Sequence, residues 1–234
     1  MVTQIHNLLE KSEPTLSKTT SLALTISAIV IVILALVVYF GIWFWARKTR
    51  RKFENEAVRE AKIKIESLRT DTGILPQNLK KYYGSKENDY DVEGTINTVY
   101  QNDYQDVLVL SSNDLYPFAC VSIKTKNPIY YDVKEFDYPK FSQSQIDNPN
   151  DFHLPIKGYD NQSLDFIAIF STKQNLNDIF DGLYSKLNPK GMIAIKMNNF
   201  PKKELNLLIT HLKYSKIKFD ASYFGTKFLF IVKE

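Results

Sequence analysis

A stretch without any charged residue, from Thr19 to Ala46, constrains this chain more than any other feature. Its apolar part, Leu22–Trp45, would span ~36 Å as a helix at ~1.5 Å per residue, more than the ~30 Å hydrocarbon core of a bilayer. A buried core helix rarely runs this long without a charge. A cleaved signal peptide has a shorter apolar run that follows its positive charges. The sequence therefore predicts a transmembrane helix over Ser21–Ala46, with the lipid bilayer as its partner.

Basic residues follow this apolar run at once. Residues 47–62 contain seven basic and three acidic residues, whereas residues 1–46 and 63–234 are each balanced in charge. The positive-inside rule places the basic flank in the cytoplasm. We therefore expect a single-pass protein of the cell membrane, with an extracytoplasmic segment over residues 1–20 and a cytoplasmic C-terminal domain. The cluster Arg47–Lys52 is either a bare stop-transfer signal, the simpler interpretation, or a site for anionic lipid headgroups at ~1 kcal/mol per residue.

The remaining composition excludes several kinds of site. Cys120 is the single cysteine, so no disulfide can form within the chain. The three histidines are far apart and have no metal-ligand spacing, so we predict no metal site. The charge balance of residues 63–234 gives no clear indication of a nucleic-acid partner. No feature of the sequence indicates an oligomeric state or a partner protein.

A second helix is predicted to continue out of the membrane as a basic juxtamembrane segment, residues 47–73. Phe53, Ala57, Ala61 and Ile65 recur at steps of three and four residues, which is typical of an amphipathic helix. Asp71–Gly73 would end it. The apolar stripe can pack on the protein's own domain, which we favour, or on a partner helix.

Residues 74–234 alternate between helical and strand patterns. Short helices are expected at Gln77–Tyr83 and Gly94–Tyr100, separated by a charged turn at Ser85–Asp91. The loop-rich stretch Glu135–Gln162 has room for one helix and a weak strand, and Asn188–Gly191 reads as a turn. Further helices are predicted at Asn113–Lys124, Asn175–Leu187 and Pro201–Lys213, and strands at Asp106–Ser111, Pro128–Asp132, Leu164–Phe170, Met192–Met197, Lys218–Tyr223 and Lys227–Val232.

This alternation predicts an α/β fold with a Rossmann-like, mostly parallel sheet. The last two strands surround the short turn Phe224–Thr226, so they form an antiparallel hairpin. The predicted architecture is therefore one transmembrane helix, a basic helix and a sheet-based domain that ends in a hairpin.

The order of these elements resembles class I S-adenosylmethionine-dependent methyltransferases, in which the last strand is inserted antiparallel. Asp106–Asn113 stands where the family has its first strand and loop, and Asp132 ends the second strand, where the family has an acid for the cofactor ribose. Leu164–Met197 looks like the fourth strand, a helix, a Leu-x-Pro-x-Gly turn and the fifth strand. The chain is also similar to membrane-anchored methyltransferase-like proteins of AT-rich bacteria such as mollicutes.

The resemblance implies S-adenosylmethionine as the cofactor and a membrane-tethered methyltransferase as the function, with the methyl acceptor left open. It places the cofactor at the carboxyl ends of the strands, lined by Ser111, Ser112, Asn113, Asp114, Asp132, Phe170 and Ser171. Asp132 can instead merely cap the next helix or solvate the end of the strand.

The loop Ser111–Leu115 departs from the family because it lacks the glycines that let backbone approach a ligand. The alternative function is therefore a catalytically decayed domain that serves as a membrane-anchored interaction platform.

Overall fold

The computed structural model describes residues 18–67 and 75–234, and the side chains of residues 22–67 and 75–234. Most of the predicted extracytoplasmic segment 1–20 and the predicted helix end at Asp71–Gly73 lie outside these residues. The chain divides into two compact units, Met1–Glu54 and Asn55–Glu234, and the boundary between them falls within a helix. We describe each unit by itself.

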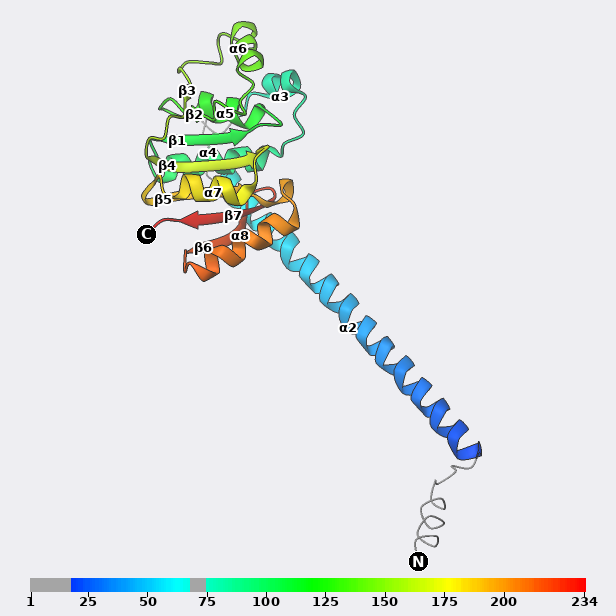
Figure 1. The fold of residues 1–234 in the computed structure, drawn as a ribbon. Helices are drawn as coiled ribbons and strands as arrows, with labels where there is room; N and C mark the ends of the chain where they lie inside the picture. The colour runs from blue at the N-terminus through cyan, green and yellow to red at the C-terminus, as the bar shows by residue number, and fades with distance from the viewer. Residues whose placement is uncertain (1–17, 68–74) are drawn as a thin grey trace, which may run out of the picture. The chain divides into compact units, whose positions relative to one another are not determined.

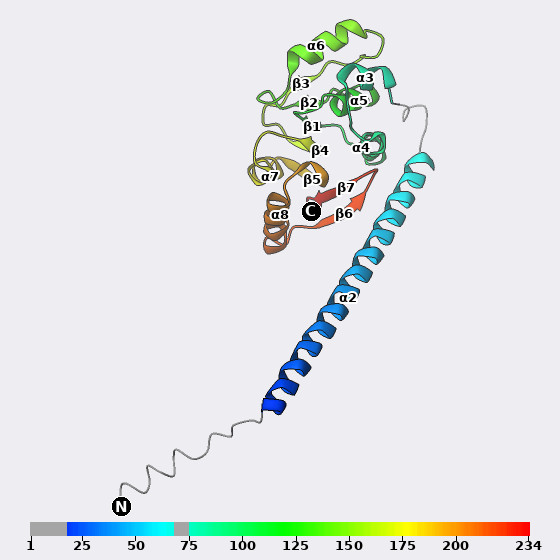
Figure 2. The ribbon, with the colours of Figure 1, turned by 90° about the vertical axis from the view of Figure 1, so that its right-hand side faces the viewer.

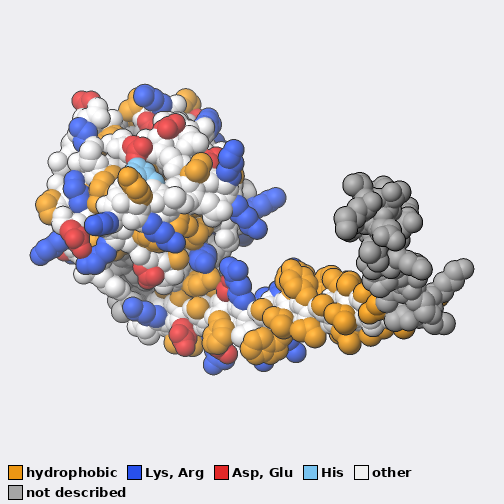
Figure 3. All heavy atoms as spheres, turned by 60° about the horizontal axis from the view of Figure 1, so that its bottom comes forward, with side chains coloured by type: hydrophobic (Ala, Val, Ile, Leu, Met, Phe, Trp, Pro, Cys, Tyr) orange, Lys and Arg blue, Asp and Glu red, His pale blue; other side chains and the backbone are white. Residues whose placement is uncertain are grey.

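The long helix α2, Lys18–Ser67, joins the predicted membrane segment and most of the predicted juxtamembrane segment without a break (Figure 1). Among the described residues, one helix, Leu22–Ser67, is long and apolar enough to cross a membrane; its most apolar window of 18 residues has a mean hydropathy of 2.9. None of its apolar window is buried by the rest of the chain. Hydrophobic side chains accordingly cover this part of α2 in the space-filling view (Figure 3).

The second unit is built around a seven-stranded sheet with the strand order β3-β2-β1-β4-β5-β7-β6 (Figure 1). All neighbouring strands are parallel except the pairs that β7 makes with β5 and β6, which are antiparallel. The predicted mostly parallel sheet with a C-terminal hairpin is thus confirmed. The strands are β1 (Val107–Ser111), β2 (Tyr130–Tyr131), β3 (Lys157–Gly158), β4 (Leu164–Ser171), β5 (Leu187–Lys196), β6 (Phe219–Tyr223) and β7 (Lys227–Val232).

Helices cover both faces of the sheet (Figure 2). Val107 and Val109 of β1 point into one core, whereas Leu108 points into the other, because side chains alternate along a strand. The first core is covered by α3 (Gln77–Tyr83), α4 (Asp89–Gln101), α5 (Tyr116–Lys124) and α6 (Tyr138–Asp147), and the second by α7 (Leu176–Tyr184) and α8 (Lys202–Tyr214). The short 3-10 helix η2, Met197–Asn199, follows β5.

Several element boundaries differ from the sequence prediction. The helix α4 begins at Asp89 instead of Gly94, because the Asn88 side chain accepts the Tyr90 N–H at 3.0 Å and caps it there. The helix α5 begins only at Tyr116. The predicted turn Asn188–Gly191 lies inside β5, where the pairing with β4 shifts register and the chain is held by hydrogen bonds between Lys190, Gly191 and Lys233.

The end of α2 that belongs to the second unit contacts the domain. The Ile65 side chain is buried, and the Tyr90 hydroxyl donates to Glu66 Oε1 at 2.6 Å. Lys62 Nζ lies 4.8 Å from the centre of the Tyr90 ring. These contacts agree with the preferred alternative, in which the amphipathic stripe packs on its own domain.

A buried charge cluster ties α4 to the end of β5 and to the hairpin. Lys196 Nζ lies 3.0 Å from Asp91 Oδ2 and also pairs with Glu87. Asp91 Oδ1 accepts the backbone N–H groups of Gly225 and Thr226 at 2.9 and 2.7 Å. Desolvation works to lower the pKa of Lys196, but its hydrogen bonds and the negative charges of Glu87 and Asp91 outweigh this effect, so the pKa is raised.

We predict that Lys196→Met lowers the free energy of unfolding of the second unit by ~3–5 kcal/mol, because it leaves two carboxylates in the core without a counter-charge. The raised pKa means that the Lys196 contribution is complete at neutral pH and is lost only as the pH rises through that pKa. Urea unfolding at pH 7, followed by the near-ultraviolet circular dichroism of the tyrosines, measures the change. Lys218→Met is the matched control, because Lys218 pairs with Glu234 at an exposed site and should leave unfolding unchanged.

We also predict that Gly94→Ala destabilises the second unit, whereas Gly182→Ala does not. A Cβ on Gly94 would lie 2.3 Å from Cγ of Phe224, while a Cβ on Gly182 would meet nothing within 4 Å. Both changes should gain about 0.5–1 kcal/mol of helix stability, but overpacking at Gly94 costs about 1–3 kcal/mol. The same urea titration compares the two variants. Equal stabilities would contradict the close contact between α4 and Phe224.

Candidate functional site

Strands β1 and β4 lie side by side and parallel in the sheet, and the side on which the chain adds further strands changes between them. From β1 the chain continues to β2 and β3 on one side, and from β4 it continues to β5 on the other. Open parallel sheets bind their ligands at such a switch point, in the crevice beyond the carboxyl ends of the strands. The loops that follow β1, β2 and β4 therefore define the candidate site.

The loop after β1 is tied to the end of β4. The Ser112 N–H donates to the Ser171 carbonyl at 3.3 Å, and the Asn113 N–H donates to Ser171 Oγ at 3.0 Å. Ser111 Oγ donates to the carbonyl of Asp114. Ser112 Oγ is buried and has no hydrogen-bond partner among the described residues. The structure thus brings Ser112, Asn113 and Ser171 together and leaves one hydroxyl available.

Two of the predicted site residues direct their side chains elsewhere. Asp114 Oδ1 accepts the Tyr116 N–H at 3.0 Å, and Asp114 Oδ2 accepts the Ser85 hydroxyl, so its carboxylate caps α5. The Phe170 ring is fully buried in the core, 6.0 Å from the ring of Phe228. Only the backbone of Phe170 is near the strand end, where its carbonyl accepts from Asn199 Nδ2 at 2.9 Å.

Asp132 stands directly after β2, as the sequence predicts, and is half-buried. Its Oδ1 accepts the Lys134 N–H at 3.0 Å, and its Oδ2 accepts from Gln174 Nε2 at 3.1 Å. The first bond closes a turn directly after β2, so Asp132 does not cap the next helix, α6, which Asp137 caps. The second bond connects the loop after β2 with the loop after β4.

Sequence reasoning missed Glu135, which makes the main connection between these two loops. Its Oε1 accepts the Thr172 hydroxyl and the N–H groups of Lys173 and Gln174, and its Oε2 also accepts the Lys173 N–H, all at 3.0–3.1 Å. The residues lie 37 to 39 positions apart in the chain, so no local pattern marks the contact. The one sequence feature that could have drawn attention to Glu135 is that it is an acid three residues after Asp132.

Two hollows border Asp132. The first is a void of about 10 Å³, enough for a single water, lined by the end of β1 and by Ser112, Asp132, Glu135 and Phe136. The second is an open pocket of about 230 Å³ on the α7 side of the sheet. Its lining includes Leu108, Leu110, Asp132, Tyr159, Gln174 and Asp178. Asp132 therefore borders both a small hollow and a larger pocket.

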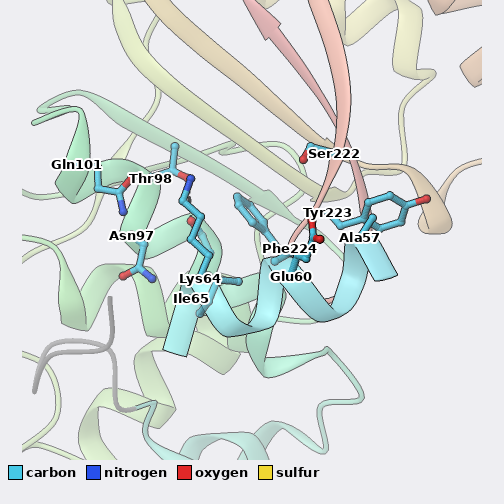
Figure 4. A pocket seen from close by; sticks show the side chains of 12 residues that line it. Ala57, Glu60, Lys64, Ile65, Asn97, Thr98, Gln101, Ser222, Tyr223 and Phe224 are labelled. Carbon is cyan, nitrogen blue, oxygen red and sulfur yellow. Dashed lines mark hydrogen bonds between the residues drawn. The ribbon is translucent and has the colours of Figure 1, made fainter. Parts of the chain in front are cut away.

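A larger hollow, about 400 Å³, lies between the end of α2, α4 and the end of β6 (Figure 4). Its lining includes Glu60 and Lys64 of α2, Asn97 and Gln101 of α4 and the Phe224 ring, and Lys64 extends toward α4. None of the predicted site residues lines this hollow. It is separate from the carboxyl ends of β1, β2 and β4.

Other reactive groups are scarce in the described part of the chain. Within residues 18–67 and 75–234, no group of three His, Cys, Asp or Glu side chains is placed to hold a metal ion. Burial raises the pKa of the Cys120 thiol far above its ordinary value, so this thiol stays protonated at neutral pH.

No protein-family model matches the sequence, and no curated protein sequence matches it. Solved structures do match the fold. A Staphylococcus aureus protein assigned as a caffeoyl-CoA O-methyltransferase superposes with a TM-score of 0.51 and 9% identity, over 72% of this chain and 95% of that chain. An O-methyltransferase from Bacillus cereus, in complex with S-adenosylhomocysteine, gives a TM-score of 0.51 and 10% identity, over 71% and 92%. The chain therefore has the fold of the class I S-adenosylmethionine-dependent methyltransferases, as the resemblance implied.

Proposed function

We propose that this chain is a membrane-tethered, S-adenosylmethionine-dependent methyltransferase. The observation that carries the proposal is the meeting of three loops at the switch point of a methyltransferase fold. There the carboxylate of Asp132 and the unpartnered hydroxyl of Ser112 border the same void. An acid and a free hydroxyl at this place are the groups that a nucleoside ligand requires.

The residues present fit the cofactor in their chemistry. An ionised carboxylate at Asp132 can accept both hydrogen bonds of a ribose diol. Ser111, Ser112 and Asn113 offer hydroxyl and amide groups for the polar end of the cofactor, in place of the bare backbone of a glycine loop. Their side chains take up space, so we expect weaker binding than a glycine-rich loop gives. The void must also widen before a nucleoside can occupy it.

When bound, S-adenosylmethionine supplies a methyl group on a positively charged sulfur. The chain's own residues hold the cofactor, keep water out and align the acceptor. Such alignment is the main source of acceleration when the acceptor is already nucleophilic. The absence of a metal cluster or an activated thiol among the described residues is therefore compatible with this reaction class.

The membrane tether is part of the proposal. It is supported by the apolar window of α2, which the rest of the chain does not bury, and by the basic residues Arg47–Lys52 that follow it. With the N-terminus outside, the domain would lie in the cytoplasm. Tethering raises the effective concentration of acceptors in or on the membrane. The proposal thus favours lipid headgroups or membrane proteins as acceptors.

One observation favours the second candidate function, a catalytically inactive interaction platform. The loop Ser111–Leu115 has no glycine, and the void beside it is only about 10 Å³. A domain that no longer binds cofactor could keep such a closed crevice. Cofactor binding therefore separates the two functions.

We predict that the full-length protein in detergent binds S-adenosylhomocysteine and that Asp132→Ala weakens this binding about ten- to a hundredfold, which corresponds to ~1–3 kcal/mol for the lost hydrogen bonds. Isothermal titration calorimetry measures both affinities. Asp181→Ala is the matched control, because Asp181 is exposed on α7, pairs with His211 of α8 and lines neither hollow beside Asp132, so it should leave the affinity unchanged. Absence of binding by the unmodified protein at millimolar ligand would leave the platform function. If Asp132→Ala binds S-adenosylhomocysteine as tightly as the unmodified protein does, the ribose does not lie on Asp132.

We further predict that protease added to intact cells leaves the domain whole, because the basic flank retains it in the cytoplasm. Immunoblotting against a C-terminal tag measures the surviving fragment, and a soluble cytoplasmic protein controls for lysis. Digestion of the tagged domain while the control survives would contradict the predicted orientation.

A further inference from the structure

Two hydrogen-bonded arms connect the loop after β2 with the loop after β4. In the main arm, Glu135 Oε1 accepts the Thr172 hydroxyl at 3.0 Å and the Gln174 N–H at 3.0 Å, and its Oε2 accepts the Lys173 N–H at 3.0 Å. In the minor arm, Gln174 Nε2 donates to Asp132 Oδ2 at 3.1 Å. We call these five residues, Asp132, Glu135, Thr172, Lys173 and Gln174, the Glu135 latch.

The sheet order determines what the latch closes. Strand β1 lies between β2 and β4, so any bond between the loops after β2 and β4 passes over the carboxyl end of β1. That end borders the void of about 10 Å³, and Glu135 is one of the residues that line it. The latch therefore bridges the switch-point crevice at the place where a ligand has to lie.

The latch also hydrogen-bonds to the Asp132 carboxylate, which the proposed function needs for the cofactor ribose. Both oxygens of Asp132 have partners in the closed arrangement, the Lys134 N–H and Gln174 Nε2. Opening the latch would free Oδ2 for a ribose hydroxyl and would remove the Glu135 side chain from the void. The bonds of the main arm to the backbone of Lys173 and Gln174 lie at exposed positions, where water can replace them.

We propose that the Glu135 latch is an autoinhibitory gate on the cofactor crevice, and that S-adenosylmethionine binds only when Glu135 releases the loop after β4. This inference rests on the proposed function, because the gate is defined by the ligand that it admits. A gate of this kind lowers the apparent affinity by the fraction of molecules in which it is open. Removing Glu135 from the main arm should therefore strengthen binding, the opposite of the effect expected for a residue that contacts the ligand, such as Asp132.

The test compares Glu135→Ala with the unmodified full-length protein in detergent, using calorimetric titration with S-adenosylhomocysteine. We expect Glu135→Ala to bind about tenfold or more tightly, which corresponds to a change in opening equilibrium of ~1.4 kcal/mol or more. Glu204→Ala is the matched control. Glu204 Oε2 also accepts a backbone N–H at the start of α7, that of Leu176 at 3.2 Å, but it does so from α8 and not across β1. This control should leave the affinity unchanged.

A second measurement reports on the latch without any ligand. Hydrogen exchange of the Lys173 amide should be slow in the unmodified protein and faster in Glu135→Ala, because this amide donates to the Glu135 carboxylate and loses that acceptor. The Gln174 amide should change less, because it also donates to Thr172 Oγ at 3.0 Å. Glu135→Gln keeps the shape of the side chain but removes its charge, so it should give intermediate exchange and intermediate affinity. It also provides a folded variant if Glu135→Ala is unstable.

The outcomes separate the gate from the proposed function. Tighter binding by Glu135→Ala together with faster exchange supports both. Equal or weaker binding by Glu135→Ala keeps the proposed function and overturns the gate. If neither protein binds S-adenosylhomocysteine at millimolar concentration, the proposed function fails and the gate fails with it. Unchanged exchange of the Lys173 amide in Glu135→Ala would overturn the latch itself.

Discussion

The parallel pairing of β1 with β4 is the constraint on which the candidate site depends. Leu108 lies opposite Ile167 and Val109 opposite Ala168, so the two strands end at the same edge of the sheet. The register then shifts between Leu110 and Ser111, which sets Ser111 opposite Ser171. This shift accompanies the bond from the Asn113 N–H to Ser171 Oγ, so the glycine-free loop is held against β4. The crevice and the loops around it all follow from this pairing.

The fold and the site carry different amounts of functional information. The likeness to solved O-methyltransferases at 9–10% identity shows a shared fold. Many functions can occupy one fold, so function has to be argued from the site. At the site, Asp132 and the Ser112 hydroxyl, which has no partner among the described residues, favour a nucleoside ligand, whereas the small volume of the void favours an inactive platform. The Glu135 latch reconciles these observations, because a closed crevice is the expected resting state of a gated site.

The strands could be predicted from the sequence because several are buried on both faces. Such strands appear as continuous apolar runs, as in β1 and β4. The helix starts were less predictable, because they depend on single caps such as Asn88. The position of Asp132 was predicted because it depends only on where β2 ends. The orientation of Phe170 was not, because its ring turns into the core while the next residue, Ser171, reaches the loop after β1. The contacts of Glu135 and of Lys196 join distant parts of the chain, and they arise from the three-dimensional fold alone.

An experimental structure of the full-length protein with S-adenosylhomocysteine tests the central claim most directly. The account predicts that the ligand lies beyond the carboxyl ends of β1 and β2, with its ribose hydroxyls on the Asp132 carboxylate. It also predicts that the Glu135 carboxylate no longer accepts the Lys173 and Gln174 N–H groups. A ligand bound elsewhere, such as in the hollow beside α2, would contradict the account, and so would a ligand in the crevice beneath an intact latch.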